Sequence, residues 1–123
     1  MVSLKSSNKN EAIDIVNKKL KLNIANKNTI FSNINKTVDV WWFEISNTKF
    51  NNDLYILLNN AKTKSMYCFL VPKGAITNPQ NVFYQRKDKT NKSHIEVLVD
   101  NKVFMDRKGG FLFTQYLIKE INY

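Results

Sequence analysis

Most apolar residues of this chain fall into short runs that are rich in β-branched and aromatic side chains and are separated by polar residues. This pattern is typical of strands. Because the connections between successive runs are mainly short, neighbouring strands are expected to pair antiparallel. The pattern therefore predicts a small antiparallel sheet of five to six strands. The runs cover residues 38–46, 53–58, 65–71, 82–87, 93–99 and 103–105.

Two other segments show helical spacing. Apolar side chains recur every three or four residues over 9–21, and Asn8 with Glu11 has the spacing of a capping box. Apolar residues also recur at helical intervals over 111–121, directly after two consecutive glycines. We therefore expect an N-terminal and a C-terminal helix, both packed on the sheet.

The expected fold class is α+β, in a single domain that spans residues 1–123. Residues 1–7 are polar and are predicted to be disordered. The stretch 23–37 is rich in Asn, Ser and Thr but also carries Ile and Phe. Because linkers seldom carry such apolar residues, an ordered loop with a short helical turn after Thr29 is expected there.

Two adjacent tryptophans, Trp41 and Trp42, lie within the first predicted strand. Neighbouring side chains of a strand point to opposite faces, so we expect one indole in the core and the other under a helix or in a groove. Structural packing is the favoured interpretation, because a domain of this size needs large side chains in its core. The alternative is an aromatic surface, shared with tyrosines such as Tyr84, that stacks bases or holds a small ligand.

The chain is strongly basic. It carries 19 Lys and Arg residues against 10 Asp and Glu residues, a formal net charge of +9. A charge of this size favours a polyanionic partner such as nucleic acid or an acidic protein. However, all but two of these cations are lysines, and asparagine is also abundant. Both amino acids have A/T-rich codons, so genome composition is an alternative source of part of the charge.

The cations are most concentrated around the hairpin expected between runs 82–87 and 93–99. A two-stranded ribbon can enter the major groove of DNA or clamp its backbone, and a glutamine there can read base edges. A solvated hairpin tip is the alternative interpretation. The predicted nucleic-acid-binding residues are Arg86, Lys87, Lys89, Lys92, Lys73, Arg107, Lys108 and Gln85.

Candidate catalytic chemistry is sparse. Cys68 lies inside an apolar run, which favours a buried strand residue over a reactive thiolate. His94 is interpreted as a half-exposed strand residue, and one histidine with one cysteine is too few for a zinc site. We predict no catalytic residue, no metal and no cofactor. The apolar runs are also too short to span a membrane, and the expected location is cytoplasmic.

Three functions remain open. The favoured one is a non-catalytic nucleic-acid-binding domain, for duplex DNA above all, of the kind used as a recognition module in restriction or mobile-element systems. The second is a small metal-dependent nuclease that uses Asp39 or Glu44 with Asp106 and Lys108, because such enzymes need carboxylates and a lysine around a divalent cation. The third is a bacterial or phage factor that docks on an acidic protein. The sequence favours no particular oligomeric state.

Overall fold

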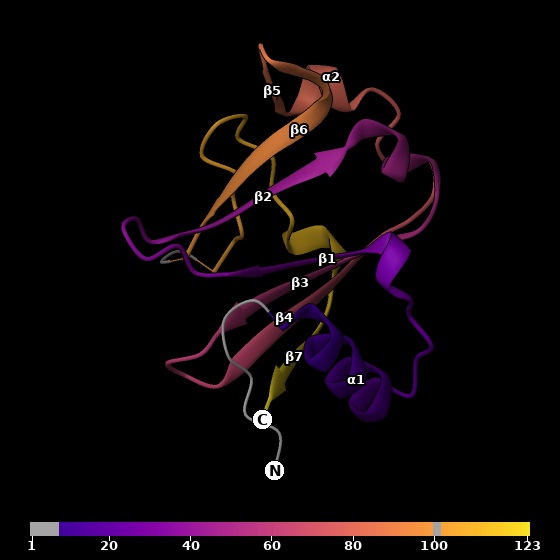
Figure 1. Ribbon diagram of the computed structural model, residues 1–123, viewed down its shortest axis with the longest axis vertical. Coiled ribbons are helices and arrows are strands. Elements are labelled where there is room, and N and C mark those ends of the chain that lie inside the picture. Colours follow the sequence, from indigo (N-terminus) through magenta and orange to yellow (C-terminus); the bar gives the residue numbers. More distant parts are fainter. Residues whose placement is uncertain (1–7, 100–101) are drawn as a thin grey trace.

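The computed structural model describes residues 8–99 and 102–123, with only the backbone at positions 89 and 90. Its strands form two sheets, and one twelve-residue helix, α1 (Lys9–Leu20), covers the larger sheet (Figure 1). In spatial order, the larger sheet consists of β1 (Thr29–Asn33), β3 (Leu54–Asn60), β4 (Ser65–Val71) and β7 (Leu117–Asn122). The smaller sheet consists of β2 (Val40–Ser46), β6 (Lys89–Leu98) and β5 (Tyr84–Arg86).

The remaining elements are short. The 3-10 helices η1 (Asn26–Asn28) and η2 (Asn47–Asn51) precede β1 and β3, and η3 (Thr114–Tyr116) precedes β7. The single helical turn α2 (Pro79–Val82) leads into β5. Within the described ranges, no helix is both long enough and apolar enough to cross a membrane.

Two hydrophobic cores hold the three layers together. The first lies between the sheets and contains Trp41, Phe69 and Phe113, each at most 2% exposed. The second lies between α1 and the larger sheet and includes Val16, Leu57, Cys68 and Ile121. The central strands β3 and β4 are therefore covered on both faces, which explains why their sequences read as nearly continuous apolar runs.

Helix α1 begins as the sequence predicts. The Asn8 side chain accepts a hydrogen bond from the Glu11 backbone N–H at 3.0 Å and donates to the Glu11 carboxylate at 2.6 Å. The first bond is the N-cap half of a capping box and supplies a partner for an N–H group that a helix start leaves unpaired, whereas the second bond links the two side chains. The helix ends at Lys21, whose φ of 55° places it in the left-handed region. The prediction for residues 9–21 is thus confirmed.

The predicted fold class is wrong in its architecture. The chain has seven strands in two sheets and one main helix, where a single sheet with a helix at each end was expected. The segment 111–121 forms η3 and the strand β7 in place of a C-terminal helix. Strand β7 pairs antiparallel with β4 and covers an edge that would otherwise present unpaired backbone groups. This tertiary pairing overrides the helical spacing of the apolar residues.

The predictions for two short segments are also wrong. The expected helical turn after Thr29 is strand β1, which pairs parallel with β3 and so depends on a partner far away in the sequence. In the expected strand over 103–105, Met105 forms one isolated bridge, to Leu112. Phe104 there has a φ of 54°, which takes its backbone out of the extended region. The prediction of disorder for residues 1–7 lies outside the described residues.

Candidate binding face on the three-stranded sheet

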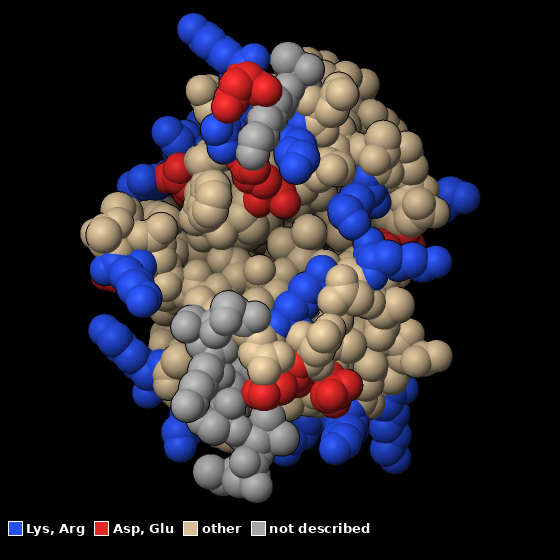
Figure 2. All heavy atoms as spheres, in the orientation of Figure 1, with Lys and Arg blue, Asp and Glu red and all other residues tan. Residues whose placement is uncertain are grey.

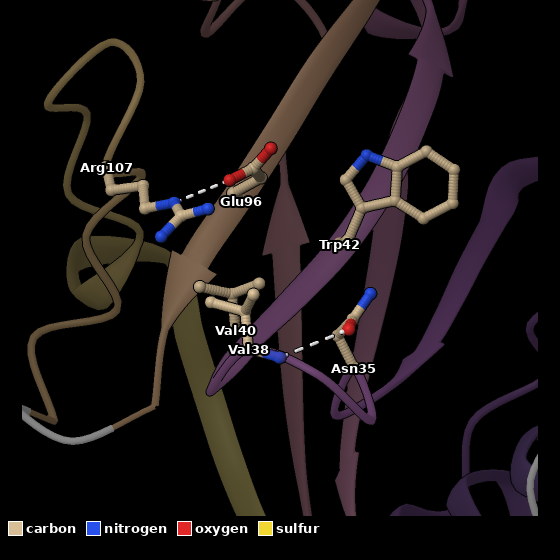
Figure 3. Close-up of a pocket in the computed structure, with 6 residues that line it drawn as sticks. All are labelled: Asn35, Val38, Val40, Trp42, Glu96 and Arg107. Carbon is tan, nitrogen blue, oxygen red and sulfur yellow. Dashed lines mark hydrogen bonds and ion pairs between the residues drawn. The ribbon is translucent and has the colours of Figure 1, made fainter.

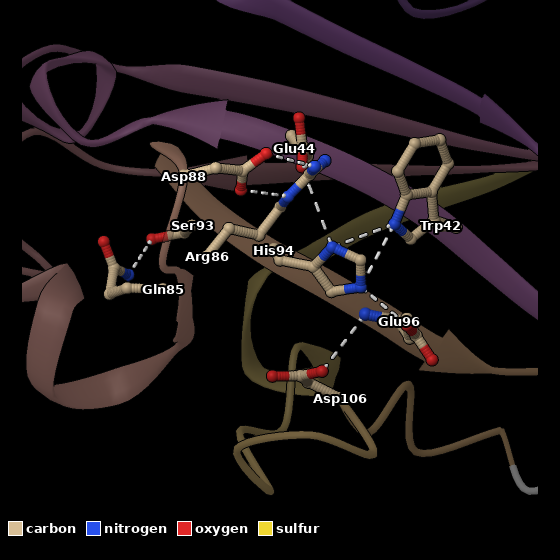
Figure 4. A network of polar contacts seen from close by, with 9 residues as sticks. All are labelled: Trp42, Glu44, Gln85, Arg86, Asp88, Ser93, His94, Glu96 and Asp106. Atoms are coloured by element: carbon tan, nitrogen blue, oxygen red, sulfur yellow. Dashed lines mark hydrogen bonds and ion pairs between the residues drawn. The ribbon is translucent and has the colours of Figure 1, made fainter. Parts of the chain in front are cut away.

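The smaller sheet has one face packed in the core and an opposite face, here called the outer face, that carries the chain's main cluster of polar and aromatic side chains. Strand alternation places Trp42 and Glu44 of β2 on this face, and strand pairing sets them opposite Glu96 and His94 of β6. Tyr84 of β5 is paired with His94 on the other side of the central strand. Pairing across three strands therefore brings these five side chains together. Figure 4 shows Trp42, Glu44, His94 and Glu96 among them.

Three rings form a row across the strands of the outer face. The Trp42 and His94 rings lie 5.7 Å apart between centroids, and Tyr84 meets His94 edge-on at 5.8 Å. Trp42 is 43% exposed and Tyr84 is 46% exposed. The ammonium group of Lys108 lies 5.5 Å from the centre of the Tyr84 ring, within cation–π range. The row therefore presents two large aromatic surfaces to solvent, with a cation beside one of them.

His94 links the row to two carboxylates. Its Nε2 lies 2.6 Å from Glu96 Oε2, and its Nδ1 lies 3.7 Å from Glu44 Oε2. The indole N–H of Trp42 is 3.1 Å from both ring nitrogens. With a proton on Nε2, the His94 ring can donate to Glu96 and accept the Trp42 N–H at Nδ1. Glu96 therefore orients His94, and His94 orients the exposed indole.

Two arginines flank the carboxylates. Arg86 donates to Glu44 at 2.9 Å and, through two nitrogens, to Asp88 at 3.0 and 2.8 Å. Arg107 donates to Glu96 at 2.5 Å. Each arginine is thus held by acids but still reaches solvent, with 33% of the Arg86 side chain and 41% of the Arg107 side chain exposed.

The surroundings of Glu96 favour its ionised form. Burial alone would raise the pKa of this carboxyl group. The hydrogen bonds from His94 and Arg107, with the charges of Arg107 and Lys108, together outweigh burial and hold the pKa below its ordinary value. Glu96 is therefore a fixed negative charge around which the neighbouring cations are arranged.

A buried carboxylate, Asp106, shapes the turn that carries Arg107 and Lys108. Its Oδ1 accepts backbone N–H groups of Glu96 and Lys108, and its Oδ2 accepts the N–H of Gly109, all at 3.1 Å. A side chain at position 109 would not fit, because a Cβ atom there would come within 2.4 Å of the Val82 carbonyl oxygen. This turn holds the two cations against the edge of the outer face.

A shallow hollow of about 310 Å³ lies beside the exposed indole (Figure 3). One wall is the Arg107–Glu96 pair, and the opposite wall is Trp42. The apolar floor and lower rim consist of Val40, Val38 and Asn35. The hollow therefore combines an aromatic wall, an apolar floor and a guanidinium group that can donate hydrogen bonds.

The residues predicted from the sequence are only partly brought together. Arg86, Arg107 and Lys108 border the outer face, and Lys87 is exposed at the tip of the β5–β6 hairpin. Lys92 is half-buried in the first half of β6, opposite Ser46 at the end of β2. The Lys89 side chain lies outside the described residues.

Two of the predicted residues do not contribute to the outer face. Gln85 is held internally, because its amide contacts Asn47, Ser93 and the Phe83 carbonyl at 2.8 to 3.2 Å. Lys73 follows β4 of the other sheet, where its N–H donates to Asp53.

The residues considered for a nuclease are not assembled. Asp39 precedes β2 and lines a separate hollow with Val99, whereas Glu44 is five residues along the chain and contacts Arg86. Asp106 uses both carboxylate oxygens on backbone N–H groups. Within residues 8–99 and 102–123, no three His, Cys, Asp or Glu side chains are grouped so as to hold a metal ion.

Sequence reasoning missed the central residues of the outer face. Alternation within each strand places Trp42 on the same face as Glu44, and His94 on the same face as Glu96. It does not predict the pairing register that sets β2 and β5 on either side of β6 and so brings these side chains together. That register is fixed by tertiary packing and by the two-residue hairpin tip, and it leaves no local motif.

Comparison of the chain with protein-family models, with curated proteins and with solved structures gives no match. The functional argument therefore rests on the residues of this chain alone.

Proposed function

We propose that this chain is a non-catalytic nucleic-acid-binding domain that uses the outer face of the β2–β6–β5 sheet. In this proposal, bases stack on Trp42 and Tyr84, while the cations at the border contact phosphates. The observation that carries the proposal is the pair of nearly half-exposed aromatic rings set among cations on an open sheet face. We place this activity in the cytoplasm, where a recognition module of a restriction or mobile-element system would meet its target.

The energetics of the face support this role. Stacking of one base on an aromatic side chain contributes about 1–3 kcal/mol and depends little on base identity. Lys108 and Arg107 add positive charge next to the rings, so a strand that stacks its bases there meets cations along its backbone. Figure 2 shows Lys and Arg side chains around most of the visible outline, so long-range attraction to a polyanion would not be confined to one patch.

The geometry favours unpaired bases over an intact duplex. A base can stack on Trp42 or Tyr84 only where its own neighbour has been displaced, as in a single strand. The predicted reader of base edges, Gln85, already has partners for its amide within the domain. Arg86 is likewise engaged with two carboxylates. Duplex binding through the hairpin, which the sequence favoured, would therefore rely on phosphate contacts alone.

The proposal is tested by fluorescence anisotropy with labelled single-stranded DNA, RNA and duplex DNA, at low and near-physiological salt. An acidic polymer serves as competitor. We expect a single strand to bind best and to resist the polymer, because the acidic polymer has no bases to stack. Equal, salt-sensitive binding of every polyanion, or no binding, would contradict the proposal. Tight binding of an acidic protein in place of nucleic acid would favour the docking-factor hypothesis.

Variants separate stacking from general charge. Trp42→Ala should weaken single-strand binding by about fivefold to about 150-fold, the equivalent of about 1–3 kcal/mol. Trp42→Phe keeps a ring but loses the N–H that meets His94, so it should lose less affinity. Ile118→Ala is the control, because Ile118 is 45% exposed on β7 of the other sheet. An equal loss in the control would show that Trp42 is not a contact.

A further inference from the structure

A second polar hollow lies away from the outer face, between the 3-10 helices η1 and η2. Its volume is about 330 Å³, and its walls contain two lysines, two asparagines and no carboxylate. Lys27 and Asn28 come from η1, Lys49 comes from η2, and Asn52 follows η2. These four residues are here called the lysine hollow. At about 30 Å³ per water molecule, it has room for a phosphate group together with several waters.

One cation of the hollow, Lys49, is held in place by a backbone oxygen. The Lys49 ammonium group donates to the Lys27 carbonyl oxygen at 2.5 Å. Nearby, the Lys9 ammonium group at the start of α1 donates to the Asn26 carbonyl and side-chain oxygens at 3.0 and 3.1 Å. Both lysines are half-buried, whereas most protein lysines extend into solvent. Lys9 of α1 and Lys49 of η2 thus both direct their ammonium groups to η1, which itself carries Lys27.

The electrostatics of this region lack a counter-charge. Burial, and next the positive charge of Lys49, lower the pKa of Lys9. Among the ion pairs found in the described residues, none involves Lys9, Lys27 or Lys49. Like charges held together without an acid create a local positive potential.

We propose that the lysine hollow is an anion site that takes a phosphoryl group, with Lys27 and Lys49 as its charged ligands and Lys9 as a supporting cation. Free phosphate and the phosphodiester of a nucleic-acid backbone are the two sources of such a group, since both present the same oxygens. A phosphate accepts hydrogen bonds from ammonium and amide N–H groups, and its charge offsets the repulsion between the lysines. This site does not depend on the outer face, so either proposal can fail without the other.

The test is a titration of the intact chain, followed by amide NMR spectra, with inorganic phosphate at constant ionic strength. A second titration uses a single-stranded oligonucleotide without terminal phosphates. We expect saturable shifts of the Lys27, Asn28, Lys49 and Asn52 amides in at least one titration. Shifts with inorganic phosphate alone identify a free phosphoryl ligand, and shifts with the oligonucleotide identify the backbone. No saturable shift of these amides in either titration would overturn the site.

Charge-matched variants complete the test. Lys49→Gln and Lys27→Gln should each weaken binding by about tenfold, as expected for the loss of a charged hydrogen bond. Lys19→Gln, an exposed position on α1, removes the same charge outside the hollow and should leave affinity within about twofold. The amide spectra report whether each variant is folded. An equal loss in Lys19→Gln would show a general charge effect and overturn the site.

Discussion

Asp106 makes a strong prediction because one buried carboxylate organises the whole turn beside the outer face. It is fully buried, and it accepts three backbone N–H groups at 3.1 Å. A hydrogen bond to a charged group contributes about 1.5–3 kcal/mol, and an unpaired buried donor costs about 1–3 kcal/mol. Lys108 and Gly109 are exposed, so in a variant without the carboxylate water can bind their N–H groups, whereas Glu96 is buried. The total loss of stability is therefore smaller than the sum over three hydrogen bonds.

We therefore expect Asp106→Ala to lower the free energy of unfolding by about 3–5 kcal/mol. Asp106→Asn should cost less, about 2 kcal/mol, because its remaining oxygen can still accept the N–H groups of Glu96 and Lys108. Both variants should also weaken nucleic-acid binding, since Arg107 and Lys108 lose their fixed positions. Urea denaturation monitored by circular dichroism gives the free energies, and anisotropy gives the affinities.

The matched control is Asp53→Ala. Asp53 is exposed and accepts a single backbone N–H, that of Lys73, at 2.8 Å. Its removal should cost less than about 1 kcal/mol, because water can replace the lost acceptor. If Asp106→Ala proved no more destabilising than Asp53→Ala, the reasoning that Asp106 holds the turn would be refuted.

Three other predictions follow from single contacts. Burial raises the pKa of Cys68 to about 12, so its thiol should resist alkylation in the folded chain and react fully in urea; rapid native labelling would contradict this. Because the folded-state pKa of Glu96 lies below its ordinary value, its stabilisation is present above about pH 4.3 and is lost as pH falls further. Glu96→Gln should therefore flatten the loss of stability between about pH 5 and about pH 3, and an unchanged slope would exclude this role. Gly109→Ala should cost about 1–3 kcal/mol through its contact with the Val82 carbonyl, whereas Gly110→Ala, with open space but a φ of 82°, should cost about 1 kcal/mol; the reverse order in urea denaturation would show that the contact relaxes.

Local signals predicted much of the secondary structure. The spacing of Asn8 and Glu11 indicated the start of α1, and alternation indicated the buried face of β6, which carries Ile95 and Val97. The prediction that one tryptophan is in the core is confirmed, since Trp41 is 2% exposed and packs between the sheets. These features depend on residues a few positions apart, so a sequence pattern can carry them.

Features that depend on distant pairing were missed. Strand β1 exists because it pairs with β3, and β7 exists because it covers the edge of β4. Likewise, the hairpin cations were expected to form the site, but the structure ties Gln85 to Asn47 and Ser93. The two exposed rings, Trp42 and Tyr84, come from two different strands on either side of β6. Such arrangements are set by which strands meet, and the local sequence does not encode this.

The most direct test of the central claim uses the two tryptophans as reporters. The chain is labelled with 5-fluorotryptophan, its two fluorine NMR resonances are assigned with Trp42→Phe, and a short single-stranded oligonucleotide is added at physiological salt. The outer-face account predicts that the resonance of the exposed Trp42 shifts and saturates, while that of the buried Trp41 stays in place. An oligonucleotide that binds without moving the Trp42 resonance would contradict the account.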